Sequence, residues 1–140
     1  MSIKFIFEDI KTFKLEKKVL KYWLTEAIKS EGKSVGDIVY IFCSDSYLLK
    51  INKEYLNHDY FTDIITFDYV EGKLISGDIF VSCDRVEENS LVYEVSFNNE
   101  LCRVMIHGIL HLLGYKDKSD KDQLIMRKKE DYYLNILNVN

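Results

Sequence analysis

The chain has 140 residues, of which 47% are hydrophobic and 30% are charged, and its formal net charge is −4. This composition excludes a disordered chain and a protein that binds nucleic acid simply by being basic, and we expect residues 1–140 to form a single domain. No apolar run approaches the ~20 residues of a membrane span, and the first residues lack the features of a signal peptide, so we expect a cytoplasmic protein with no membrane partner.

The first third of the chain predicts two strands that flank a helix. Residues Ile3 to Phe7 alternate and are rich in strand-forming side chains, which predicts a first strand. Apolar residues then repeat at helical spacing from about Leu15 to Ser30, and Gly32 is placed to end that helix. The stretch from Asp37 to Cys43 predicts a second strand.

The middle third predicts a helix and a hairpin. Ser44, Asp45 and Ser46 can cap a helix that carries apolar residues at helical spacing, and a polar break at residues 57–60 follows it. Two further strands, from Ile64 to Val70 and from Leu74 to Ser82, flank a short turn at residues 71–73. We expect these two strands to pair as an antiparallel hairpin.

The last third is predicted to be helical. A helix is expected from Asp84 to about Val95, Ser96 or Asn98 can cap the next helix, and Ser119 can cap a final one. Early strands, a hairpin and helices on both sides of it predict an α+β fold with a small mixed four-stranded sheet. The three cysteines, Cys43, Cys83 and Cys102, are widely spaced and odd in number, so we expect buried reduced thiols.

The most informative stretch runs from Glu100 to Lys118 and reads ELCRVMIHGILHLLGYKDK. Its apolar spacing predicts an amphipathic helix of about three turns, and Gly114 suits the left-handed position that ends a helix. His107 and His111 then stand four residues apart on one face, with Cβ atoms roughly 5–6 Å apart. This separation lets both imidazoles reach one ion at the ~2.0–2.1 Å of a zinc–nitrogen bond.

A third ligand is available just beyond this helix. The turn at Gly114 reverses the chain, and Asp117, three residues later, can bring a carboxylate to the same ion. The pattern His-x-x-x-His-x-x-Gly-x-x-Asp has the spacing of the metzincin zinc motif with an aspartate at the third position. We therefore predict one zinc ion per chain, bound by His107, His111 and Asp117. The alternative, a chance histidine pair on an ordinary core helix, stays open at this point.

The residues around the motif narrow the chemistry. Zinc peptidases of the His-Glu-x-x-His type carry their general base directly after the first histidine, and Gly108 occupies that position here, so peptidase chemistry is disfavoured. Three protein ligands leave an open fourth position, which favours a catalytic site over a structural one. No residue of the sequence is identified as the general base.

Cations follow the motif. Lys116, Lys118 and Lys121 come directly after it, and further basic residues lie at positions 127–129. We expect Lys116, Lys118 and Lys121 to contact phosphates of a substrate. A solvated helix face is the simpler interpretation of the lysines near the N-terminus.

The motif resembles the signature of the YbeY endoribonucleases, also called rRNA maturation factors. That signature is His-Gly-x-Leu-His-Leu-x-Gly-Tyr-Asp-His, and this chain reads HGILHLLGYKD from His107 to Asp117. The upstream blocks are also similar and stand in the same order: Asn52, Tyr55, Asp59, residues 62–67 (TDIITF) and residues 77–79 (GDI).

This resemblance implies a single-domain α+β fold and a zinc-dependent enzyme that cleaves single-stranded RNA. It also implies a role in 16S rRNA 3′-end maturation and ribosome quality control, with the small ribosomal subunit as a partner. It places the zinc ligands at His107, His111 and Asp117. Two departures from the family matter most: its third histidine is Asp117 here, and its usual arginine is Leu56. Lys116, which replaces the aspartate of the signature, can partly compensate for that missing cation.

Two other functions remain compatible with the sequence. The first is a non-catalytic, ribosome-associated assembly factor with a structural metal, which Leu56 and the sequence pI of about 5.4 support. The second is a metal-dependent hydrolase of another substrate, which Gly108 disfavours. RNA cleavage separates the enzyme from the assembly factor, because an assembly factor would leave RNA intact.

Overall fold

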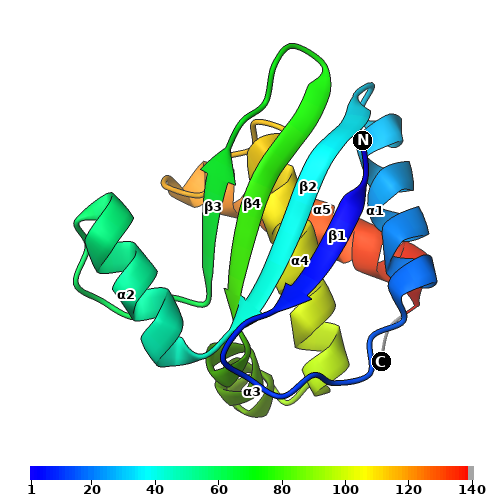
Figure 1. The fold of residues 1–140 in the computed structure, drawn as a ribbon. Helices are drawn as coiled ribbons and strands as arrows, with labels where there is room; N and C mark the ends of the chain where they lie inside the picture. The colour runs from blue at the N-terminus through cyan, green and yellow to red at the C-terminus, as the bar shows by residue number, and fades with distance from the viewer. Residues whose placement is uncertain (139–140) are drawn as a thin grey trace.

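A computed structural model describes residues 1–138, which form one α+β domain of four strands and five helices (Figure 1). The strands are β1 (Ile3–Phe7), β2 (Ser34–Cys43), β3 (Ile64–Asp68) and β4 (Leu74–Ser82). The helices are α1 (Lys17–Ser30), α2 (Asp45–Leu56), α3 (Cys83–Val92), α4 (Phe97–Leu112) and α5 (Asp120–Leu137). No helix in the described part is both long and apolar enough to cross a bilayer.

The four strands form one mixed sheet in the order β1-β2-β4-β3. Strand β2 runs parallel to both β1 and β4, whereas β3 pairs with β4 in antiparallel fashion. A bridge between Glu71 and Leu74 closes the predicted hairpin. The predicted α+β class and the mixed sheet are therefore confirmed.

The two faces of the sheet are covered unequally. Ile79 and Val81 of β4 point into the main core, which lies between the sheet and the helices α1 and α4. Phe80, between them in sequence, points to the other face and packs with Leu48 of α2 in a smaller apolar cluster. Helices α4 and α2 thus lie on opposite faces, with β3 at the sheet edge beside them (Figure 1).

Serine side chains cap four of the helices, and the sequence predicts three of these caps; the fourth, Ser82 at the start of α3, was not predicted. The hydroxyls of Ser44, Ser96 and Ser119 accept backbone N–H groups at 3.1, 3.0 and 3.0 Å from the residues three positions on. These contacts satisfy N–H groups that have no partner within the helix. Helix α3 ends at Val92 rather than near Val95, because Glu94 adopts a left-handed φ of 55°.

Other boundaries also differ from the prediction. Strand β2 begins at Ser34, three residues early, and its pairing with β4 is irregular between Val35 and Ile38. Helix α4 is longer than expected, with 16 residues from Phe97. The cysteines are all free, but only Cys43 and Cys102 are buried, and Cys83 is partly exposed. Burial raises the pKa of each thiol to about 12, which leaves these groups protonated and unreactive at neutral pH.

Candidate metal centre

The position of α4 against the sheet decides where its histidines point. A Cβ atom at Gly108 would come within 2.9 Å of the Ile79 side chain and 3.1 Å of Ile64, so the helix lies directly against β3 and β4 at this residue. A larger residue does not fit there unless these side chains move. Gly108 therefore faces the sheet, and the position of the peptidase general base points away from solvent.

The end of α4 returns the chain toward the histidines. Gly114 has a φ of +104°, and its N–H donates to the carbonyl of His111 at 3.0 Å. The next N–H, from Tyr115, reaches back to the carbonyl of Leu110 at 3.0 Å. This pair of bonds is a Schellman motif, which confirms the predicted helix end at Gly114. The reversed chain then carries Asp117 back alongside the helix.

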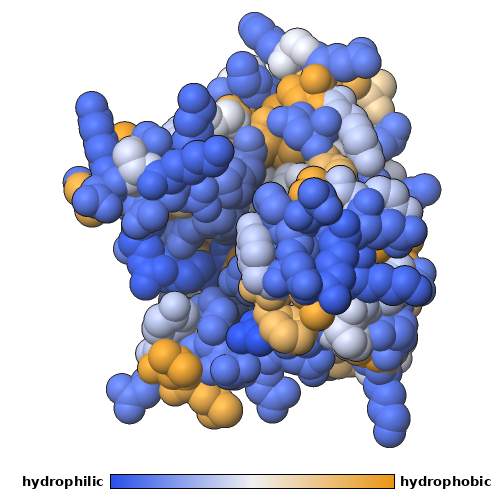
Figure 2. All heavy atoms as spheres, turned by 90° about the vertical axis from the view of Figure 1, so that its left-hand side faces the viewer, coloured by the Kyte–Doolittle hydropathy of each residue, from blue (hydrophilic) through white to orange (hydrophobic). Residues whose placement is uncertain are grey.

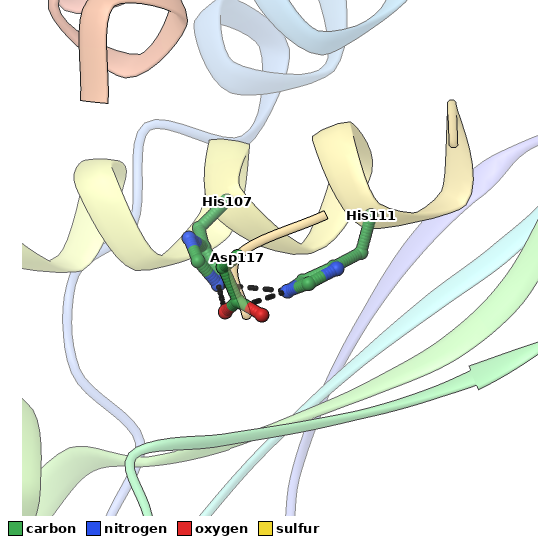
Figure 3. A group of neighbouring side chains, drawn as sticks. All are labelled: His107, His111 and Asp117. Atoms are coloured by element: carbon green, nitrogen blue, oxygen red, sulfur yellow. Dashed lines mark hydrogen bonds and ion pairs between the residues drawn. The ribbon is translucent and has the colours of Figure 1, made fainter. Parts of the chain in front are cut away.

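The structure brings His107, His111 and Asp117 together (Figure 3). The two Nε2 atoms are 3.0 Å apart, and Oδ2 of Asp117 lies 3.2 Å from Nε2 of His111 and 3.4 Å from Nε2 of His107. Ligand atoms at zinc-bond distances on a tetrahedral ion stand about 3.3 Å apart, so these three separations match one face of a tetrahedron. We call these three residues the ligand triad.

The chemistry of the donor set also fits a metal ion. Two imidazole nitrogens that face each other beside a carboxylate offer three lone pairs to one point. Imidazole and carboxylate together suit zinc, and two histidines with one carboxylate also suit ferrous iron. The predicted residues are thus arranged as a metal site requires.

Glu130 of α5 fixes the orientation of His107. The Nδ1–H of His107 donates to Oε2 of Glu130 at 2.7 Å, and Arg103 donates to the other carboxylate oxygen at 2.9 Å. Glu130 is only 5% exposed. Because Nδ1 carries the proton, Nε2 of His107 presents a lone pair to the triad, which is the usual arrangement behind a metal-bound histidine.

The two histidines have opposite pKa shifts. Burial lowers the pKa of His107, but the hydrogen bond and the charge of Glu130 outweigh it and raise the pKa overall. The pKa of His111 is lowered, first by burial and then by the neighbouring charge of His107. The difference follows from Glu130, which contacts only one of the two rings.

Glu130 was not identified from the sequence, although a signal was present. It is buried together with Met126, Tyr133 and Leu134, which lie four residues before it and three and four residues after it on the same helix. A carboxylate within an apolar stripe is a residue that needs a buried partner. The partner could not be named from the sequence, because His107 lies 23 residues away.

A second cluster anchors the turn that carries Asp117. The hydroxyl of Tyr115 donates to Glu31 at 2.6 Å, and Lys129 pairs with the same carboxylate at 3.0 Å. The hydroxyl of Tyr133 also donates to Glu31. Burial raises the pKa of Glu31, but these three donors outweigh it and lower the pKa overall. The turn is therefore tied to the end of α1 and to α5.

A cavity of about 570 Å³ opens in front of the triad. We call it the triad cavity. One wall is formed by the triad, and the opposite wall by side chains from the end of α2 and the connection to β3, on the side of the molecule shown in Figure 2. The described residues that line it are Asn52, Leu56, His58, Tyr60, Thr62, Asp63, Ile64, Ile65, Thr66, Asp68, His107, His111, Leu112 and Asp117.

The predicted phosphate contacts do not line this cavity. Lys116, Lys118 and Lys121 are exposed near Asp117, but none of them is among the lining residues, and that lining contains no lysine or arginine at all. Leu56, at the position where an arginine was expected, does line the cavity and is 40% exposed. The wall at this point is apolar rather than basic.

A smaller cavity of about 280 Å³ is also lined by His107. Its lining includes the carboxylates of Asp63 and Glu100 and the guanidinium groups of Arg103 and Arg127. Glu100 is 4% exposed, and burial, followed by the charge of Asp63, raises its pKa to about 7. Burial also raises the pKa of Asp63, which lines both cavities. No spacing in the sequence indicates that these four residues meet beside the triad.

Comparison with known proteins agrees with this architecture. A family model described as "Endoribonuclease YbeY" matches residues 4–138. A protein of that name from Flavobacterium johnsoniae is 63% identical over 109 residues, covering 78% of each chain. Its counterpart from Parabacteroides distasonis is 47% identical over 98% of this chain and 96% of the relative. The solution structure of TM1509 from Thermotoga maritima matches with a TM-score of 0.68 and 31% identity, covering 96% of this chain and 88% of the other.

Proposed function

The chain belongs to the YbeY endoribonuclease family, and from this premise we propose that it is a zinc-dependent endoribonuclease that cuts single-stranded RNA. We further propose that it acts in the cytoplasm on 16S rRNA, in 3′-end maturation and ribosome quality control, together with the small ribosomal subunit. The observation that carries the proposal is the ligand triad, whose three donors converge at the edge of an open cavity. An open cavity gives a substrate access to the metal, which a closed structural site would not.

In this proposal, His107, His111 and Asp117 hold one zinc ion. When bound, zinc supplies a Lewis acid that polarises a phosphoryl oxygen. Glu130 keeps the proton of His107 on Nδ1 and so keeps Nε2 available to the metal. The Tyr115–Glu31 bond holds the turn in place, so Asp117 stays beside the two histidines.

The positions of Asp63 and Arg127 suggest a role in catalysis for the first and in RNA binding for the second. Asp63 lines both cavities beside His107, and we assign it as the acceptor of the proton from the attacking oxygen. Arg127 is 56% exposed on its side chain and lines the smaller cavity, where it can meet a phosphate of the RNA strand. Lys116, Lys118 and Lys121 are exposed outside the two cavities, and each contributes to the salt dependence of binding.

The test is cleavage of single-stranded RNA by zinc-loaded protein and by His111→Ala purified in the same way. We expect cleavage by the first protein alone, and no cleavage of DNA of the same sequence if the 2′-hydroxyl is used. The Lys11→Ala variant, changed at an exposed lysine far along the chain from the motif, is the control and should keep full activity. Equal RNA decay with wild-type protein and His111→Ala would indicate a contaminating nuclease and would favour the non-catalytic assembly factor.

A further inference from the structure

The wall opposite the triad presents large apolar and aromatic side chains to solvent. Tyr60 is 55% exposed and Leu56 is 40% exposed, and the ring of His58 is exposed as well. All three line the triad cavity together with His107, His111 and Asp117. We call Leu56, His58 and Tyr60 the aromatic wall. Such side chains are stabilised by burial, so their exposure beside a cavity is typical of a ligand surface.

The two rings of this wall already form a stack. The ring centroids of His58 and Tyr60 are 5.2 Å apart, and the ring planes differ by 21°. The hydroxyl of Tyr60 is also 3.0 Å from Nδ1 of His58. Each ring therefore holds the other, and together they present a flat surface that a third planar group can extend.

A single buried residue fixes the ends of this wall. Asn52 is 2% exposed, its carbonyl accepts the N–H of His58 at 3.1 Å, and its side-chain amide donates to the carbonyl of Tyr60 at 2.9 Å. Asn57, which precedes His58, takes a left-handed φ of 56° that reverses the chain after α2. The wall is thus positioned before any ligand arrives, which lowers the entropic cost of binding.

The charge of the cavity restricts what can bind there. Its described lining contains three carboxylates, those of Asp63, Asp68 and Asp117, and neither lysine nor arginine. The aromatic wall therefore offers no cation to a phosphate, whereas its exposed rings can stack on an uncharged planar ring. Nucleobases are such rings, and stacking on aromatic side chains is the usual way in which single strands are held. The volume of about 570 Å³ lies within the range of small-molecule sites.

We infer that the aromatic wall is a nucleobase-binding subsite, on which one base of a single-stranded RNA stacks against His58 and Tyr60 while the backbone passes the ligand triad. This inference rests on the proposed function, because it takes RNA as the substrate. It also gives a physical origin for selectivity. A base within a duplex is already stacked and paired and is not free to enter the cavity, whereas a base in a single strand is free to do so.

The test compares the binding of two short single strands, one with all its bases and one in which the central residues are abasic. Both are 2′-O-methylated and fluorescently labelled, and a gel confirms that they stay intact. We expect wild-type protein to bind the strand with bases more tightly by about 5- to 150-fold, the range expected for one base–aromatic stack. A phosphate-only site would bind both strands equally.

Variants then assign the effect to the wall. Tyr60→Ala should lose most of the preference for the strand with bases, and Tyr60→Phe, which keeps the ring, should retain it. Tyr69→Ala is the matched control, because Tyr69 is also 55% exposed but is not among the residues that line the cavity. Metal content and thermal unfolding of each variant are measured in parallel. If Tyr60→Ala has a folding defect, the preference of Tyr60→Phe for the strand with bases is the deciding measurement.

The outcomes separate this inference from the proposed function. Equal affinity of wild-type protein for both strands, or an unchanged preference in Tyr60→Ala, overturns the subsite, even where RNA cleavage is intact. If neither strand binds, the inference is also wrong. A preference for bases that Tyr60→Ala removes, in a protein that does not cleave RNA, supports the subsite and overturns the proposed nuclease.

Discussion

The two walls of the triad cavity are held in place in very different ways. Behind the triad, the buried Glu130 fixes His107, and a Schellman turn and the carboxylate of Glu31 fix the segment that carries Asp117. The aromatic wall is tied to the fold mainly through Asn52. The triad is therefore supported by several independent contacts, whereas the exposed side chains of the aromatic wall are supported by one buried residue.

This difference follows from what each wall does in the proposal. A metal ligand displaced by a few tenths of an ångström no longer completes the coordination shell, so its supports must be rigid. A wall that admits a flexible RNA strand gains from a defined surface and tolerates small movements. We therefore expect changes behind the triad to act on metal binding, and changes under the aromatic wall to act on RNA binding without a change in metal binding.

The largest effect is expected for His107→Ala. It removes one of three donors, and two ligands hold a metal weakly, so elemental analysis should find the metal lost. His58→Ala is the control, because His58 lines the same cavity but is not part of the triad. A full equivalent of metal in His107→Ala would place the site elsewhere.

The second-largest effect on metal binding is expected for substitutions of Asp117. Asp117→Asn removes the anionic donor and should weaken zinc binding by more than the roughly 10- to 100-fold typical of changes to the partners of ligands. Asp117→His should restore binding, since imidazole suits zinc. Titration with a zinc-sensitive dye measures both. If Asp120→Asn is damaging and Asp117→Asn is silent, the third ligand has been misassigned.

The triad could be predicted from the sequence because its three residues are brought together by short-range spacing along the chain. His107 and His111 lie on one helix, and Gly114 has a backbone role that few other residues can fill, so spacing alone placed three side chains together. The four strands and the serine caps were predictable for the same reason. Each depends on alternation or on a hydrogen bond to a residue three positions away.

The remainder of the site depends on contacts between distant segments. Glu130 lies 23 residues from His107, and Tyr115 lies 84 residues from Glu31. No periodicity connects such pairs. The absence of cations from the cavity was equally hidden, because the three lysines after the motif are close to Asp117 in sequence but point to solvent.

A smaller effect is expected for Glu130→Gln. The amide still fills the space but is a weaker acceptor for Nδ1–H of His107, so zinc affinity should fall by about 10- to 100-fold. Asp131→Asn is the matched control, because Asp131 also binds Arg103, at 2.7 Å, but has no contact with His107 among the described bonds. Equal losses in both variants would show that the effect comes from Arg103 rather than from the histidine.

The smallest effect is expected for Asn52→Ala, which tests the aromatic wall. It removes one side-chain hydrogen bond to Tyr60, so the free energy of unfolding should fall by only about 0.5–1.5 kcal/mol. Zinc affinity should not change, because none of the contacts behind the triad involves Asn52. Hydrogen exchange should become faster at the amides of residues 57–63 and stay the same at residues 113–117.

Asn98→Ala, at an exposed asparagine near the start of α4, is the control for loss of an amide group. Faster exchange in both segments would mean that the two walls form one cooperative unit, and the separation between metal binding and RNA binding would then be wrong.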